Sequence, residues 1–92
     1  MDWGEAMAVL AEWAGRRVVV VPYMGPGMSL QQHVGPLDLA QPRQGVVQLR
    51  FPDRAIVLPR ATFIEAGWVP GQEQRGLSVT QGAVRIDVFL DD

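Results

Sequence analysis

After Gly15 the chain has no further stretch with helical periodicity, and this limits the architectures that it can adopt. The remainder contains short runs of β-branched or alternating apolar residues that are separated by glycine and proline. Parallel sheets need helices in their crossover connections, so the pattern excludes a parallel α/β fold. It predicts a mainly β protein, a small and strongly bent antiparallel barrel with one N-terminal α-helix and a C-terminal β-hairpin.

The helix is predicted over residues 2–14. Asp2 and Glu5 have the spacing of a capping box at its start. Gly15 is the kind of residue that ends a helix in the left-handed conformation. The apolar residues expected on its buried face are Trp3, Met7, Leu10 and Ala14, with Val9 and Trp13 beside them.

A chain of 92 residues has room for one domain with a thin core. We expect the barrel core over residues 16–69 and the hairpin over residues 77–90. A second strand over residues 30–39 is interrupted at Gly35, where a bulge or sharp bend would keep one face buried. Residues 62–69 predict a further strand or a short helical turn. Turns and loops are predicted at residues 52–53, 70–76 and 81–82.

Composition excludes several kinds of chemistry. The chain has no cysteine, so disulfides, thiol nucleophiles and thiolate metal sites are excluded, and one histidine cannot form a histidine metal cluster. The absence of lysine excludes a Walker lysine and Schiff-base catalysis. We expect no cofactor and no metal. No apolar run, that of residues 18–21 included, approaches the roughly 20 residues of a membrane-spanning helix. With no signal-peptide pattern, a cytoplasmic location without membrane contact is expected.

The glycine-rich stretch Gly25-Pro26-Gly27 follows the first predicted strand, as phosphate-binding loops often do. Such a loop needs the free N–H groups of a following helix, and a strand is predicted after Met28 instead. We interpret the stretch as an ordinary hairpin loop.

Catalysis has weak support in the sequence. Ser29, His33 and Asp38 are close along the chain, but closeness in sequence does not make a triad. We interpret His33 as a surface or half-buried strand histidine. No catalytic residue is assigned, and the chain is predicted not to be an enzyme.

Nucleic-acid binding is the better supported alternative. Small bent barrels bind single strands with aromatic platforms and a cationic rim. Arg50, Arg54 and Arg60 fall at strand ends or turns, as does Tyr23, and these four form the candidate nucleic-acid site. The net charge of −2 weighs against this hypothesis, because nucleic-acid domains commonly carry a basic surplus.

The order of elements resembles the Sm-like family, in which an N-terminal helix packs on a bent five-stranded barrel. The resemblance covers residues 3–69 and rests on LAEWAGRRVVVV, HVGPLDL and AIVLPRATFIEAGWV, in which Arg60 matches the arginine of the family's second motif. It implies a ring of several subunits that are joined through edge strands, with RNA bound at loops facing the pore.

The leading hypothesis is a non-enzymatic interaction module that associates with itself or with another protein through edge strands. The strand over residues 83–90 is long and β-prone, and we expect it at an exposed edge with Arg85, Asp87 and Phe89 on its outer face. The first alternative is an Sm-like oligomer that binds single-stranded RNA. The second is an enzyme whose site the sequence does not show.

Overall fold

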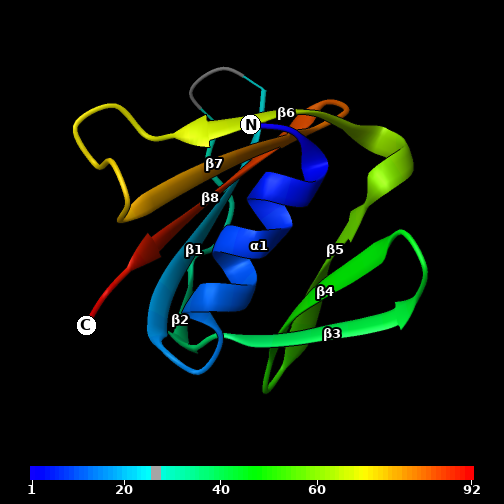
Figure 1. Cartoon of the computed structure of the whole chain (residues 1–92). Helices are drawn as coiled ribbons and strands as arrows, with labels where there is room; N and C mark the ends of the chain where they lie inside the picture. The colour runs from blue at the N-terminus through cyan, green and yellow to red at the C-terminus, as the bar shows by residue number, and fades with distance from the viewer. Residues whose placement is uncertain (26–27) are drawn as a thin grey trace.

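Strands make up most of the structure, which confirms the mainly β class. The computed structural model describes residues 1–25 and 28–92, and there it has one α-helix, α1 (Trp3–Trp13), and one 3₁₀ turn, η1 (Arg60–Thr62) (Figure 1). The strands are β1 (Arg17–Met24), β2 (His33–Pro36), β3 (Asp38–Arg43), β4 (Val46–Phe51), β5 (Arg54–Pro59), β6 (Phe63–Trp68), β7 (Gly76–Gln81) and β8 (Val84–Leu90).

The strands form two antiparallel sheets rather than one closed barrel. The larger sheet has the order β2-β1-β8-β7-β6 and the smaller one β3-β4-β5. The chain passes from one sheet to the other at Leu37, whose N–H donates to the Arg16 carbonyl and whose carbonyl accepts from the Gly15 N–H, both at 2.8 Å. The predicted interruption of the strand over residues 30–39 therefore falls at Leu37, two residues after Gly35, which lies within β2 opposite Val18.

β8 lies in the middle of the larger sheet, so the prediction of an exposed edge over residues 83–90 is wrong. It pairs with β1 on one side and with β7 on the other. Val20 of β1, for example, lies opposite Val88. The C-terminal hairpin is therefore part of the main sheet and not an addition to a core over residues 16–69. Local sequence cannot reveal this arrangement, because the first and last strands are neighbours only in space.

The predicted helix and its capping box are confirmed. The Asp2 carboxylate accepts from the Glu5 N–H at 2.8 Å, and the Glu5 carboxylate accepts from the Asp2 N–H at 3.1 Å. Gly15 has φ +84° and ends the segment. The buried residues of α1 are Ala6, Leu10 and Trp13. Ala14, which was expected on the buried face, is exposed because the helix stops one residue before it.

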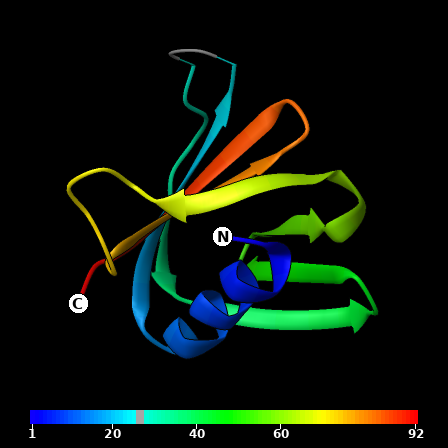
Figure 2. The ribbon, with the colours of Figure 1, turned by 45° about the horizontal axis from the view of Figure 1, so that its top comes forward.

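The core lies between the two sheets, and α1 closes it on one side. Figure 2 shows α1 between β6 and β3. Trp13 and Trp68 form a tilted pair with ring centroids 6.3 Å apart beside this core. Its buried members are Leu10, Trp13, Val18, Val20, Leu37, Leu49, Leu58, Leu77, Val79, Ile86 and Val88.

The observed turns lie at or close to the positions predicted from the sequence. Phe51 pairs with Arg54 across the predicted two-residue turn at residues 52–53. The last hairpin turns at residues 82–83, one position later than predicted, with Gly82 at φ +56°. Residues 60–62 form the 3₁₀ turn and β6 follows it, so both elements considered for this region occur in succession. The loop Gly25-Pro26-Gly27 falls partly outside the described residues, and its interpretation stays a prediction.

Arginines bind the last two residues of the chain. Arg16 donates to both carboxylate oxygens of Asp92, at 2.7 and 2.9 Å, and Arg75 donates to the Asp92 carbonyl at 3.2 Å. Arg17 donates to Asp91 at 3.0 Å. Three of the eight basic residues are thus engaged by the acidic end of the chain.

The hydrogen bond from Arg16 is the main cause that holds the pKa of the Asp92 carboxyl below its ordinary value. A carboxyl with a lowered folded-state pKa stabilises the fold above its ordinary range, and this contribution is lost as the pH falls through the lowered pKa. We expect a carbon-detected NMR titration of Asp92 to show a midpoint below the ordinary value. In Arg16→Gln the midpoint should return to that value. If the midpoint of Asp92 is the same in the variant as in the original protein, Arg16 is not the cause of the lowered pKa.

Candidate functional site

Cross-strand register places residues of the larger sheet in two parallel rows on its outer face, and the first of these rows is polar. One row runs over β6, β7, β8 and β1 as Glu65, Thr80, Arg85 and Tyr23. The next row follows the same strands as Gly67, Ser78, Asp87 and Val21. Residues directly opposite each other in antiparallel strands share a face, so these side chains belong to one surface.

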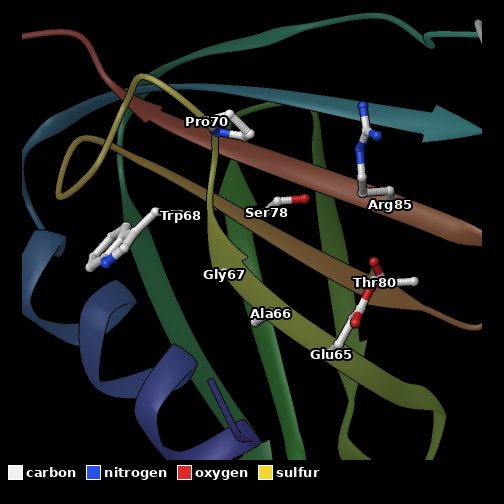
Figure 3. A pocket seen from close by; sticks show the side chains of 8 residues that line it. All are labelled: Glu65, Ala66, Gly67, Trp68, Pro70, Ser78, Thr80 and Arg85. Carbon is white, nitrogen blue, oxygen red and sulfur yellow. The ribbon is translucent and has the colours of Figure 1, made fainter.

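An open hollow lies on this surface. We name it the Gly67 hollow; it has a volume of about 360 Å³. Figure 3 shows Ser78, Thr80 and Arg85 on the face of the sheet, with Glu65 beside Thr80, whereas Trp68 turns toward the helix. Its lining residues are Glu65, Ala66, Gly67, Trp68, Pro70, Ser78, Thr80 and Arg85.

Gly67 is the least explained residue of this surface. It lies in the interior of β6, its φ is not in the left-handed region, and a Cβ built on it would meet nothing within 4 Å. Glycine in a strand lowers stability by about 0.5–1 kcal/mol relative to alanine. Neither backbone conformation nor packing requires glycine here. Such glycines often mark a place where a ligand or another backbone approaches closely.

Arg85 is held in place from two sides. Its guanidinium carbon lies 4.3 Å from the centroid of the Tyr23 ring, a cation–π contact that contributes about 0.5–1 kcal/mol at an exposed site. Its Nε lies 3.3 Å from Oδ1 of Asp87, whose side chain is 7% exposed. That oxygen has no hydrogen-bond partner in the described residues, so the pair is a charge contact without hydrogen-bond geometry. Arg85 and Tyr23 also line a second hollow of about 320 Å³.

Phe89 continues this outer face, but it does not form an exposed edge. It lies opposite Gly76 in the ladder, and a Cβ on Gly76 would come within 2.9 Å of the ring. The glycine lets the ring lie flat on the neighbouring strand. Of the three residues proposed for an assembly edge, Asp87 is buried and Phe89 is half-buried, while Arg85 is exposed.

The structure separates the four candidate nucleic-acid residues. Arg50 and Arg54 lie near the β4–β5 turn, where Arg54 is 3.6 Å from Asp53 and Arg50 faces Asp38 in the ladder. Arg60 follows the far end of β5, about 20 Å away at 3.3 Å per residue. Tyr23 belongs to the other sheet and is covered by the guanidinium of Arg85. These residues do not form one basic surface.

The three residues considered for catalysis do not form a site in the described part of the chain. His33 is 7% exposed and its ring lies 5.1 Å from that of Phe51, so it is a buried residue between the sheets. Ser29 forms an isolated bridge with Tyr23, and no hydrogen bond among residues 1–25 and 28–92 joins it to His33 or Asp38. The same residues contain no group of three or more side chains arranged to hold a metal ion.

Exposed apolar side chains occur on the strands that end the sheets. Val34 on β2, Val57 on β5 and Ile64 on β6 are 48%, 47% and 60% exposed. All three belong to edge strands. The sequence predicted an exposed edge at residues 83–90, which form the central strand β8. Alternation of apolar residues shows which face of a strand is buried, but it does not show whether the strand has one neighbour or two.

Comparisons of the chain with protein-family models, with curated proteins and with solved structures found no match. No helix within the described residues is long and apolar enough to cross a membrane.

Proposed function

We propose that this protein is a non-enzymatic interaction module that forms a dimer through the free edge of β5. Two copies would pair their β5 strands antiparallel about a twofold axis, which joins the two smaller sheets into one. The observation that carries the proposal is that β5 is the least protected of the edge strands.

The other three edges carry features that oppose pairing. β2 has only four residues. The register of β6 shifts between Phe63 and Glu65, and the N-terminal amine donates to its Ala66 carbonyl at 2.8 Å. β3 contains Pro42 and a register shift after Ala40. Short length, bulges and proline are common ways in which proteins block an edge.

β5 has none of these features along its middle, and its one proline, Pro59, is its last residue. Its register with β4 is regular from end to end, and residues 55–58 carry no charge. No backbone hydrogen bond in the described part of the chain uses its second edge. Val57 adds an exposed apolar side chain near that edge. A regular, uncharged and uncovered edge is a template for pairing with another strand.

Light scattering across a dilution series tests this proposal. We expect a dimer at high concentration that dissociates on dilution. Val57→Lys puts a charge at the middle of the edge and should weaken dimerisation by at least about tenfold, or about 1.4 kcal/mol. Val34→Lys is the matched control, because Val34 is equally exposed but lies on β2. A monomer at every concentration, or equal effects of the two substitutions, would refute the proposal.

A further inference from the structure

We propose that the Gly67 hollow binds a short zwitterionic peptide, with the ammonium group of the peptide at Glu65 and its carboxylate at Arg85. This site lies on the face of the larger sheet, whereas the proposed dimer uses the edge of the smaller one. The two proposals are therefore independent.

The charges of the hollow favour a ligand with both signs. Glu65 lies at one end of the first polar row, and no cation of the described residues is within ion-pair distance of it. Arg85 lies two strands away, its Nε is the atom nearest to Asp87, and no hydrogen bond of the described residues uses its Nη groups, which can therefore meet a ligand. A simple anion would meet the repulsion of Glu65, and a simple cation that of Arg85. A zwitterion meets an opposite charge at each end.

The spacing indicates the length of the ligand. Adjacent strands lie about 4.8 Å apart, so the backbones at Glu65 and Arg85 are separated by about 10 Å. A fully extended chain spans about 3.3–3.6 Å per residue, and three residues therefore cover this distance. The volume of about 360 Å³ lies at the lower end of the range for sites of small ligands.

Gly67 and two hydroxyl residues complete the site. The missing side chain at Gly67 allows a peptide backbone to approach the sheet. Ser78 and Thr80 line the hollow, and a hydroxyl can both donate to a peptide carbonyl and accept from a peptide N–H. Arg85 is already held by Tyr23 and Asp87, so little of its freedom remains to be lost on binding.

Triglycine titrated into the isotopically labelled full chain tests the proposal by NMR. We expect saturable shifts of amide signals in β6, β7 and β8 around Gly67, with a dissociation constant in the millimolar range or below. N-acetyl-triglycine lacks the ammonium group and triglycinamide lacks the carboxylate. Each should bind about tenfold more weakly, because each loses one charge-assisted contact.

Variants assign each end of the ligand. Glu65→Gln should weaken triglycine about tenfold but should not weaken N-acetyl-triglycine, which has no ammonium group and is freed from the repulsion of Glu65. Arg85→Gln should weaken triglycine in the same way but should not weaken triglycinamide, which has no carboxylate. Gly67→Leu should abolish binding by filling the hollow. Glu12→Gln, which changes an exposed carboxylate on α1, is the control and should have no effect.

Three results would overturn the proposal. These are the absence of shifts at millimolar triglycine, shifts that map to another surface, and equal affinities for the three peptides. If Arg85→Gln lowers the stability of the fold, Glu65→Gln and the modified peptides still decide the question, because Glu65 is exposed and no contact of the described residues depends on its charge.

Discussion

Replacing Trp13 by alanine is expected to lower the free energy of unfolding by about 3–5 kcal/mol. Trp13 is 3% exposed and anchors the end of α1 in the core, where its ring pairs with that of Trp68. Its removal leaves a cavity between the helix and the core. A domain of this size has a total stability of about 5–14 kcal/mol, so the loss is a large part of it.

Urea unfolding followed by far-UV circular dichroism measures this effect without depending on tryptophan fluorescence. Trp3→Ala is the comparison, because Trp3 lies on the same helix but is half-buried, with its ring edge-on to Phe63 at 5.7 Å. It should cost clearly less than Trp13→Ala. Equal losses at the two positions would contradict the described packing of α1.

The second large effect is expected for Gly76→Val, which should cost about 3 kcal/mol, the upper end of the range for overpacking. Even a single Cβ on Gly76 would lie 2.9 Å from Cδ1 of Phe89 and 3.0 Å from Cβ of Gln72. Gln72 is held close by a hydrogen bond, because the Gly76 N–H donates to its carbonyl at 2.7 Å, and Phe89 is half-buried. Thermal and urea unfolding should both show the loss.

Gly67→Val is the matched control, because it introduces the same side chain in the adjacent strand of the same sheet, where no atom lies within 4 Å. It should leave stability unchanged or raise it slightly, because valine favours strands. In a Phe89→Ala background, Gly76→Val should cost much less, since the ring that it meets is gone. Additive effects of these two substitutions would show that the clash is not the cause.

Local features of the fold could be predicted from the sequence, because each depends on residues that are close along the chain. The capping box of Asp2 and Glu5 and the turn after Phe51 are of this kind. The order of the strands in the sheets could not be predicted in this way. The pairing of Val20 with Val88 joins residues 68 positions apart, and nothing in either segment marks the other as its partner.

The same limit applies to the candidate site. The sequence placed Arg85, Asp87 and Phe89 correctly on one outer face, because alternation fixes the face of each residue in a strand. It did not reveal that Glu65 and Thr80 lie in the same row as Arg85, since that requires the register of three strands. The glycine in the middle of residues 62–69 was the one signal in the sequence that pointed to the hollow.

The central position of β8 also affects how the protein is made. Val84–Leu90 is synthesised after all the other strands of its sheet, yet it inserts between β1 and β7. Until then β1 has one unpaired edge, and the larger sheet exists only as two separate pieces, β2-β1 and β7-β6. The chain therefore carries exposed strand edges until β8 has been synthesised, and the larger sheet can close only after that point.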